Sequence, residues 1–349
     1  MKIPFSTTFR TSKSSADSLE NVIVVLNTEE GVAGVGESAP TQFTGESKKT
    51  VIGSIEGMEG IIKDCHFTNY REIHNEIREK FRTQHSARAA VEIGLFDALS
   101  KFWEIPLTDL FGGSEEKVVT DATVPISGVE ESLEIAGKHA ERGFETVKIK
   151  VGRDWEEDLE RISKISERFP NLKIRVDANQ AFEPKEALRF LEKIEDLGIH
   201  PEIFEQPVGR ENISGLRFLR KRTDVKIAAD ESLFSARDAI TLIKREAADV
   251  LNLKIMESGL VEALEIISIG SNSNVELMIG CMGESDIAIK TASSLAAGTG
   301  KFDYVDLDSQ LFLEEGAAEL PPNPFIGPEK GYGHGASMEK LEDYISWIE

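Results

Sequence analysis

Hydrophobic and polar positions follow a regular pattern along the second part of the chain. From about residue 120, short runs rich in β-branched and apolar residues are separated by longer amphipathic stretches. This alternation is typical of βα units that form a parallel sheet. Eight such units predict a (β/α)-barrel, in which the last helix can be altered to give a (β/α)7β arrangement. The expected strands are residues 120–124, 147–151, 174–179, 203–207, 227–232, 250–255, 277–282 and 304–308, with helices such as 130–142, 158–168, 184–197, 236–245 and 260–269 between them.

The beginning of the chain has a mixed α+β pattern instead. Residues 21–26 and 32–37 are two β-rich runs around a polar turn, which predicts a hairpin. Apolar residues at helical spacing then predict three helices, over 47–64, 70–81 and 86–103. We therefore expect an α+β capping domain at 1–115 and a barrel domain at 116–320. The last segment, about 321–349, is expected to return and complete the capping domain.

Composition narrows the class of protein. The chain has 349 residues, 40% of them apolar and 29% charged, as in ordinary globular proteins. A formal net charge of −22 repels phosphate backbones and anionic lipids, so we expect no nucleic-acid or membrane partner. The sequence shows neither a membrane-length apolar run nor a signal-peptide pattern, which predicts a cytoplasmic protein. Cys65 and Cys281 are too few for a disulfide framework. Formation of a homo-oligomer is left open.

The carboxyl ends of the expected barrel strands carry mostly charged residues. One end residue recurs every 24 to 28 positions from the second strand to the eighth. Because these strand ends build the active site of such barrels, the residues should surround one pocket. They are Lys150, Asp177, Glu205, Asp230, Lys254, Met282 and Asp308.

Three acids end consecutive strands: Asp177, Glu205 and Asp230. Carboxylates that converge in a barrel mouth repel one another and lose hydration. A hard divalent cation removes both problems, and ligation by oxygen alone suits Mg²⁺. The three acids therefore predict a site for one Mg²⁺ ion per subunit.

Lysines are expected on two opposite sides of the same pocket. Lys148 and Lys150 share one face of the second strand, and Lys254 lies on the sixth strand, across the barrel. A nearby metal and a second ammonium disfavour protonated lysine, so Lys150 and Lys254 could act as bases. The predicted chemistry is removal of an α-proton beside a carboxylate, with an enediolate stabilised by the metal and a proton returned to the opposite face. Structural ion pairs are the alternative for these lysines.

The last expected strand adds Asp306 and Asp308, which share one strand face. The predicted metal already has three acids. These two aspartates therefore suit a positively charged part of the substrate, such as a free ammonium group. Exposed acids at a strand end are the alternative.

These motifs resemble the enolase superfamily, in its muconate-lactonising subgroup. The resemblance covers nearly the whole chain. Within the subgroup, the sequence GCMGES at 280–285, followed by two aspartates separated by one leucine, is similar to the dipeptide epimerases. The residues that carry the resemblance are Lys148-Ile149-Lys150, Asp177-Ala178-Asn179, Glu205-Gln206-Pro207, Asp230-Glu231-Ser232, Lys254 and Asp306-Leu307-Asp308.

The resemblance implies an isomerase that inverts the α-carbon of the second residue of an L-Ala-X dipeptide. Lys150 and Lys254 would be the acid/base pair, and Asp306 and Asp308 would hold the ammonium of the dipeptide. The three strand-end acids would hold Mg²⁺. The other matching residues would contact or support the substrate: Lys148 at its carboxylate, Thr123, Asn179 and Met282 along the pocket, and Glu231 behind the metal ligands.

The identity of residue X depends on two cap loops, expected at residues 9–17 and 41–46. Epimerases of L-Ala-D/L-Glu often place a cation in the first loop, where the best match here is Ser14, with Lys13 adjacent. Residue X is therefore expected to be Glu, contacted by Lys13, or an apolar residue. The alternatives are an N-acylamino acid racemase or o-succinylbenzoate synthase, whose substrates offer no ammonium to the aspartate pair. A non-catalytic binding barrel would leave the filled catalytic positions unexplained.

Overall fold

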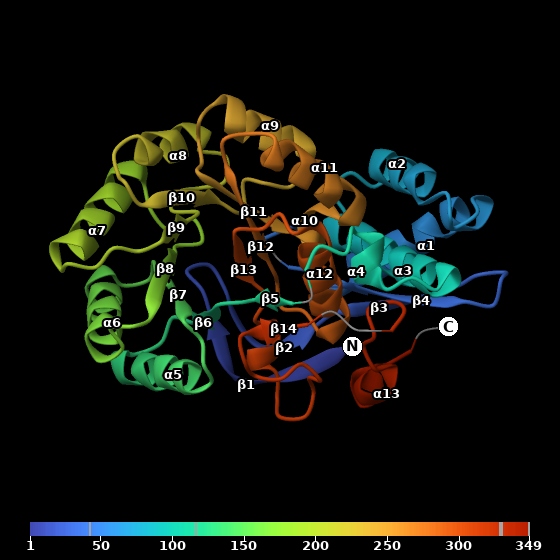
Figure 1. Ribbon diagram of the computed structural model, residues 1–349, viewed down its shortest axis with the longest axis horizontal. Coiled ribbons are helices and arrows are strands. Elements are labelled where there is room, and N and C mark those ends of the chain that lie inside the picture. The colour runs from blue at the N-terminus through green and yellow to red at the C-terminus, as the bar shows by residue number, and fades with distance from the viewer. Residues whose placement is uncertain (42, 116, 328–330, 348–349) are drawn as a thin grey trace.

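The computed structural model of the protein describes residues 1–41, 43–115, 117–327 and 331–347. An eight-stranded parallel sheet curls into a barrel, with helices outside it and a cap of antiparallel strands and helices at one side (Figure 1). This confirms the predicted (β/α)-barrel with an α+β cap. No helix among the described residues is long and apolar enough to cross a membrane.

Each barrel strand pairs with the next one in sequence order. The first and last strands meet where the backbone N–H of Asp121 donates to the carbonyl of Val305, at 3.2 Å. The strands are β6 (Ala122–Val124), β7 (Thr146–Lys150), β8 (Lys173–Asp177), β9 (Ile203–Glu205), β10 (Lys226–Ala229), β11 (Val250–Lys254), β12 (Glu276–Gly280) and β13 (Tyr304–Asp306).

Seven of the eight strands are followed by a helix. The eighth, β13, is followed only by the short 3₁₀ turn η1 (Ser309–Phe312), so the arrangement is (β/α)7β. The helices are α5 (Val129–Glu141), α6 (Trp155–Arg168), α7 (Pro184–Asp196), α8 (Ile213–Arg220), α9 (Ala236–Lys244), α11 (Leu260–Ser271) and α12 (Asp286–Thr299), with the four-residue α10 (Ile255–Ser258) directly after β11.

Seven of the eight predicted barrel strands extend one to three residues too far at their carboxyl ends. β8 ends at Asp177 and β9 at Glu205, whereas the sequence pattern predicted strand as far as 179 and 207. Asn179 and Gln206 have φ angles of 40° and 33°, in the left-handed region, where a strand cannot continue. These turns begin the loops at the barrel mouth.

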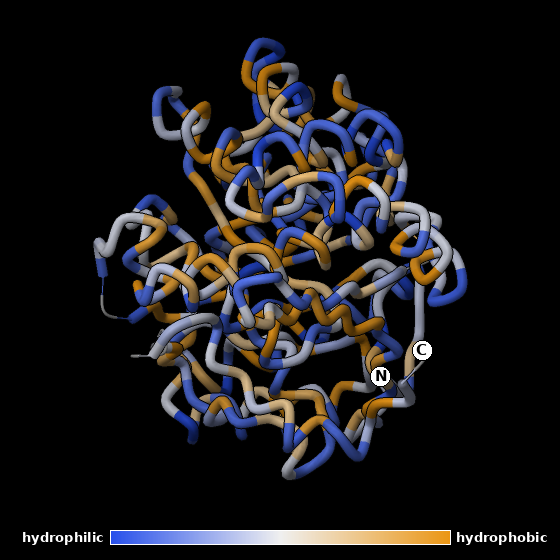
Figure 2. Tube along the Cα trace, turned by 90° about the vertical axis from the view of Figure 1, so that its right-hand side faces the viewer, coloured by the Kyte–Doolittle hydropathy of each residue, from blue (hydrophilic) through white to orange (hydrophobic). Residues whose placement is uncertain are grey.

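The core of the barrel lies between the sheet and its helices. On β7, Val147 and Ile149 are fully buried toward the helices, opposite Lys148 and Lys150. The hydrophobic segments run through the interior of the molecule, and hydrophilic segments follow the outer turns (Figure 2). The period-2 pattern of the sequence thus separates a hydrophobic layer from a charged interior.

The cap contains two antiparallel strand pairs and a group of helices. The predicted hairpin is present as β3 (Val22–Asn27) and β4 (Ala33–Ser38). The first cap loop is narrower than predicted, because β1 (Lys2–Arg10) and β2 (Ser15–Glu20) pair and leave only residues 11–14 between them. The cap helices are α1 (Lys48–Asp64), α2 (Tyr70–Lys80), α3 (His85–Trp103) and α4 (Leu107–Leu110).

Helix α3 connects the cap to the barrel. A Cβ atom added at Gly36 of β4 would lie only 1.8 Å from the carbonyl oxygen of Ala90, so strand and helix pack backbone to backbone. The C-terminal part of the chain lies against the same helix, where the N–H of His334 donates to Asp97 at 3.1 Å. That part contains α13 (Met338–Leu341), η2 (Glu342–Tyr344) and β14 (Phe325–Ile326), which pairs with β5 (Val118–Val119).

Candidate active site

The charged residues predicted at the strand ends converge at the carboxyl mouth of the barrel. Lys150 Nζ donates to Asp177 Oδ2 at 2.6 Å and to Asn179 Oδ1 at 3.2 Å. On the opposite side of the barrel, Lys254 Nζ donates to Asp230 Oδ2 at 2.6 Å. All five side chains belong to buried or half-buried residues. Each of the two lysines is therefore held by one acid of the predicted metal triad.

A third lysine lies between the acids. Lys148 Nζ forms a short ion pair with Asp306. The same ammonium lies 3.6 Å from Glu205 Oε2 and 3.7 Å from Asp177 Oδ2. The structure therefore brings one residue of the aspartate pair on the last strand into the same charge network as the triad.

The acids of this network have unequal proton affinities. Burial, reinforced by the charge of Asp177, raises the pKa of Glu205 to about 8. Burial likewise raises the pKa of Asp230 to about 6. Burial opposes ionisation of Asp177 too, but the ammonium groups of Lys150 and Lys148 lower its pKa below the usual range. Among the three acids, Asp177, with two lysine neighbours, is therefore the one whose ionised form is favoured.

Several carboxylate oxygens of the mouth are buried without a hydrogen-bond partner. They include Glu205 Oε2 and Asp230 Oδ1, from two acids of the triad. Buried carboxylate oxygens are normally hydrogen bonded or bound to a cation, so oxygens without a hydrogen-bond partner suit the binding of a metal ion. Within the described residues, the three triad acids do not all place oxygens within 4.8 Å of one another. A cation shared by all three would draw their side chains together.

Of the remaining predicted residues, four lie at the barrel mouth, whereas Lys13 is exposed to solvent. Asp308 Oδ2 accepts from the backbone N–H of Thr123 at 2.5 Å, and Asn179 Nδ2 donates to Glu231 Oε1 at 3.3 Å, so these four lie at the mouth. The side chain of Lys13, in contrast, is exposed and makes no hydrogen bond or ion pair within the described part of the chain.

The predicted motif at residues 280–285 forms a loop after β12. The backbone N–H of Met282 donates to Glu284 Oε1 at 2.8 Å, which folds the predicted motif at 280–285 back on itself. Burial raises the pKa of Glu284 to about 8. The neighbouring Ser285 donates its Oγ–H to Glu37 of the cap at 2.8 Å, so this loop is attached to both domains of the fold.

Aromatic rings from the cap border the mouth. The centroid of the Phe9 ring lies 6.0 Å from Lys150 Nζ, and the same ring packs edge-on against Phe312 at 4.8 Å. In the second cap loop, Phe43 lies 5.5 Å from Phe234. The cap thus contributes the Phe9 ring beside Lys150, while the guanidinium of Arg210 lies 5.5 and 4.8 Å from the centroids of the Phe43 and Phe234 rings.

Two buried polar residues of the site were missed by sequence reasoning. Asn252 Nδ2 donates to Glu205 Oε1 at 2.8 Å, and Arg175 pairs with Asp121 at 2.6 Å below the mouth. Each lies two positions before a predicted site residue on the same strand, Lys254 or Asp177, and so shares its inward face. The alternation that identified the lysines could have identified these residues as well.

Comparison with known proteins places the chain among enzymes of this architecture. Residues 1–112 match the family model described as "Mandelate racemase / muconate lactonizing enzyme, N-terminal domain", and residues 131–340 match "Enolase C-terminal domain-like". The L-Ala-D/L-Glu epimerase of Thermotoga maritima is 38% identical over 308 residues, covering 88% of this chain and 89% of the relative. The hydrophobic dipeptide epimerase of Enterococcus faecalis is 35% identical over 347 residues, covering 96% and 97%.

Solved structures agree with these relatives. The dipeptide epimerase from Enterococcus faecalis V583, complexed with Mg and L-Leu-L-Tyr, superimposes with a TM-score of 0.91 at 34% identity, covering 96% of both chains. The substrate-liganded L-Ala-D/L-Glu epimerase from Bacillus subtilis gives a TM-score of 0.93 at 32% identity, also covering 96% of both. With both of its family regions matched, the chain belongs to the mandelate racemase / muconate lactonizing enzyme family of the enolase superfamily.

Proposed function

We propose that the protein is a Mg²⁺-dependent dipeptide epimerase that inverts the α-carbon of the C-terminal residue of an L-Ala-X dipeptide. The observation that carries this proposal is the pair of opposed lysines. Lys150 and Lys254 lie on β7 and β11, four strands apart in the eight-stranded sheet, and each is hydrogen bonded to an acid of the triad. Two amines on opposite sides of one pocket suit a reaction that moves a proton from one face of a carbon to the other.

The donor set fits a bound magnesium ion. Asp177, Glu205 and Asp230 would hold it, since they offer oxygen ligands only and two of them carry buried oxygens without partners. When bound, Mg²⁺ supplies a Lewis acid for the substrate carboxylate and for the negative charge that develops on it. The Enterococcus faecalis structure, solved with Mg and a dipeptide, supports this assignment.

The lysines would carry out the proton transfer. With Lys150 as the neutral amine, its Nζ accepts the α-proton, while the Lys254 ammonium gives a proton to the opposite face of the carbon. The two roles exchange in the reverse direction. Asn179 accepts a hydrogen bond from Lys150 at 3.2 Å and would orient its amine, and Glu231 supports Asn179 in turn.

The other predicted residues would fix the substrate around the reacting carbon. Asp306 and Asp308 would bind the ammonium of the dipeptide, and Lys148 its carboxylate. Although burial opposes it, the Lys148 ammonium lowers the pKa of Asp306 to about 2, which keeps a negative charge available for the substrate ammonium. Thr123 and Met282 would line the pocket.

Residue X is proposed to be apolar or Glu, and the cap supports the apolar choice. The Phe9 ring lies beside Lys150, and Lys13 is exposed to solvent without a partner among the described residues. An apolar side chain would pack on the ring, whereas a glutamate side chain would need Lys13 to turn inward. The division of the chain at residues 115 and 116 and the cytoplasmic location stay predictions.

The test is mass spectrometry of a dipeptide library incubated with the enzyme and Mg²⁺ in D₂O. Members of the form L-Ala-X should gain one deuterium, and the extent of exchange ranks the preferred X. Lys150→Ala and Lys254→Ala should each still exchange one epimer but interconvert neither. Lys164→Ala, at an exposed lysine of α6, is the control and should behave like the unchanged protein. If no dipeptide exchanges, the proposal is wrong, and N-acyl amino acids are the next substrates to test.

A further inference from the structure

The two proposed bases are held in place from different parts of the molecule. The backbone carbonyl of Lys150 accepts from Arg161 of α6 at 3.0 Å, and its side chain contacts Asn179 after β8. Both of these partners belong to the barrel. Lys254 is the last residue of β11 and is followed directly by the short helix α10, which lies against the cap helix α3. The turn after Lys254 therefore has cap neighbours that the backbone of Lys150 does not have.

Three cap residues contact the segment that follows Lys254. Each makes one hydrogen bond to a residue between 256 and 261: the N–H of Ala39 donates to Met256 Sδ at 3.4 Å, His85 Nδ1 contacts the carbonyl oxygen of Glu257 at 2.8 Å, and Glu92 Oε2 accepts from the N–H of Val261 at 2.9 Å. A Cβ atom added at Gly259 would lie 2.6 Å from Glu92 Oε2, so this segment approaches α3 closely. The cap therefore holds the chain after Lys254 at three points.

The hydrogen bond between His85 and Glu257 has one possible direction. A backbone carbonyl can only accept, so the proton of the neutral ring lies on Nδ1 and points at Glu257. Burial, together with the charge of Arg88, lowers the pKa of His85 to about 4, so the ring is neutral at pH 7. Arg88 Nη2 lies 3.1 Å from the same nitrogen and cannot donate to it in this tautomer. His85 is thus a fixed donor to the turn that follows Lys254.

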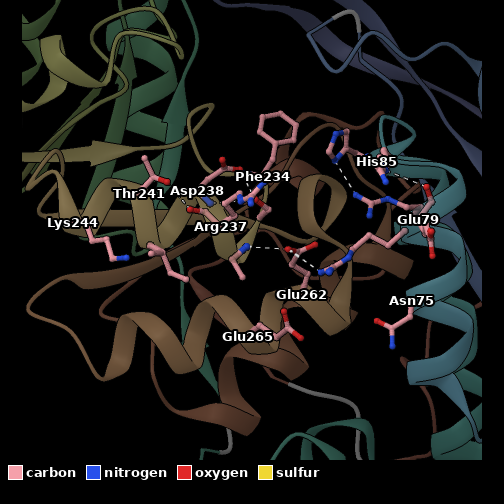
Figure 3. A pocket seen from close by; sticks show the side chains of 16 residues that line it. Asn75, Glu79, His85, Phe234, Arg237, Asp238, Thr241, Lys244, Glu262 and Glu265 are labelled. Atoms are coloured by element: carbon pink, nitrogen blue, oxygen red, sulfur yellow. Dashed lines mark hydrogen bonds and ion pairs between the residues drawn. The ribbon is translucent and has the colours of Figure 1, made fainter.

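The ring of His85 is also packed against the barrel. It lies edge-on to the ring of Phe234, with the two centroids 4.7 Å apart. Figure 3 shows both residues at one wall of a cavity of about 1150 Å³, which lies between cap helices α2 and α3 and barrel helices α9 and α11. Phe234 also contacts Phe43 of the second cap loop, at 5.5 Å. The His85 ring therefore lies where α3, the barrel and the second cap loop meet.

Helix α10 has little internal support for its conformation. It spans only four residues, and a helix of that length is not stable on its own. Both carboxyl oxygens of Glu257 are buried without a hydrogen-bond partner, so its side chain does not anchor the turn. Because α10 joins Glu257 to Lys254 within a single turn, a displacement of the Glu257 carbonyl would also displace the backbone from which the Lys254 side chain extends.

We propose that His85 is a positioning residue for Lys254, which it places by holding the carbonyl of Glu257. The inference rests on the proposed epimerase function, because Lys254 acts as a base only in that function. It predicts an asymmetry between the two faces of the α-carbon. Loss of the His85 donor disturbs proton transfer at the face served by Lys254 and leaves the face served by Lys150 unchanged. A general loosening of the protein would slow proton transfer at both faces.

The experiment follows early deuterium uptake from D₂O into each epimer of the preferred dipeptide separately, with the full-length enzyme and Mg²⁺. Lys254→Ala first identifies the epimer whose exchange needs Lys254. His85→Phe keeps a ring against Phe234 but has no donor, and should lower exchange of that epimer by about tenfold, the effect of one ordinary hydrogen bond. Exchange of the other epimer should match the unchanged protein. His85→Asn, whose amide can donate in place of Nδ1, should recover most of the loss.

The matched control is His200→Phe, at an exposed histidine before β9, which should leave both exchange rates unchanged. An equal decrease for both epimers in His85→Phe, or a decrease for neither, would show that His85 does not position Lys254. If circular dichroism shows that His85→Phe does not fold, His85→Ala is compared in the same way. If the unchanged protein exchanges neither epimer of any dipeptide, the proposed function itself is wrong, and the role of His85 is refuted with it.

Discussion

Arg161 stabilises the segment that carries Lys150, and its replacement should destabilise the protein strongly. It is a fully buried side chain of α6. Its guanidinium donates to the carbonyl oxygens of Lys150 and Pro125, at 3.0 and 2.9 Å, and to Asp158 Oδ1, at 2.8 Å. Nε donates to Ser132 Oγ at 2.9 Å. Arg161→Met keeps much of the side-chain volume and removes all four hydrogen bonds.

The size of the stability loss depends on the buried groups that lose Arg161 as their partner. Removing one partner of a buried ion pair lowers the free energy of unfolding by about 3–5 kcal/mol, because the other charge stays buried. Here the remaining carboxylate of Asp158 still accepts from the N–H of Gly152 at 2.6 Å, and burial already raises its pKa, so it can become protonated. Protonation of Asp158 would reduce the loss. The carbonyls of Lys150 and Pro125 would lose their donors, which increases the loss by about 1 kcal/mol each. We expect a loss of about 4 kcal/mol.

Urea unfolding followed by far-UV circular dichroism measures this loss. Arg168→Met, at an exposed arginine of the same helix, is the control and should change stability by less than about 0.5 kcal/mol. The double variant Arg161→Met/Asp158→Leu should recover part of the loss, since it leaves no buried charge. A decrease below about 1 kcal/mol for Arg161→Met would refute the reasoning, because the four hydrogen bonds would then contribute almost nothing.

Three further predictions concern the cap, the response to pH and the metal. Gly36→Ala places a Cβ 1.8 Å from the Ala90 carbonyl and should lower stability by about 3 kcal/mol, whereas Gly60→Ala, with nothing within 4 Å, should be neutral or stabilising in thermal unfolding. Burial lowers the pKa of His139 from 6.5 to about 4, so the unfolded state binds its proton first, and about 3 kcal/mol of stability is lost as pH falls through this window. Urea titrations across that window should show a flatter dependence for His139→Gln. Asp230→Asn should abolish both deuterium exchange and the rise in melting temperature with Mg²⁺, and retention of either would argue against its role as a ligand.

The strand-end residues could be predicted from the sequence for a physical reason. Strands alternate in side-chain direction, and repeated βα units bring each carboxyl end to the same rim. Asp177 and Lys254 follow from these two rules alone. The partner of Lys148 does not, because its ion pair with Asp306 joins strands 158 residues apart in the chain. The rules predict which residues share a pocket, but the pairing inside it depends on side-chain distances that only the folded chain sets.

Helix α3 shows where periodicity misleads. The sequence predicts an amphipathic helix over 86–103 with one apolar face. In the structure almost the whole helix is buried, including Arg88, Glu92 and Asp97, because β4 covers one side and the barrel the other. Charged residues that the pattern assigns to solvent are therefore held inside. Burial of the Arg88 guanidinium beside a cavity depends on this long-range packing, and no local pattern indicates it.

The ion pairs of the mouth connect the proposed metal ligands to the proposed bases. Despite its burial, the carboxylates of Asp230 and Glu257 raise the pKa of Lys254 well above its usual range, so that its amine stays protonated. The partner of Lys254 is one acid of the triad, and the partner of Lys150 is another, Asp177. In the proposed mechanism these acids would engage the cation, which would weaken the negative charge beside both lysines. The same three carboxylates would then hold the metal that binds the substrate carboxylate and would also set the charge around the two proposed bases.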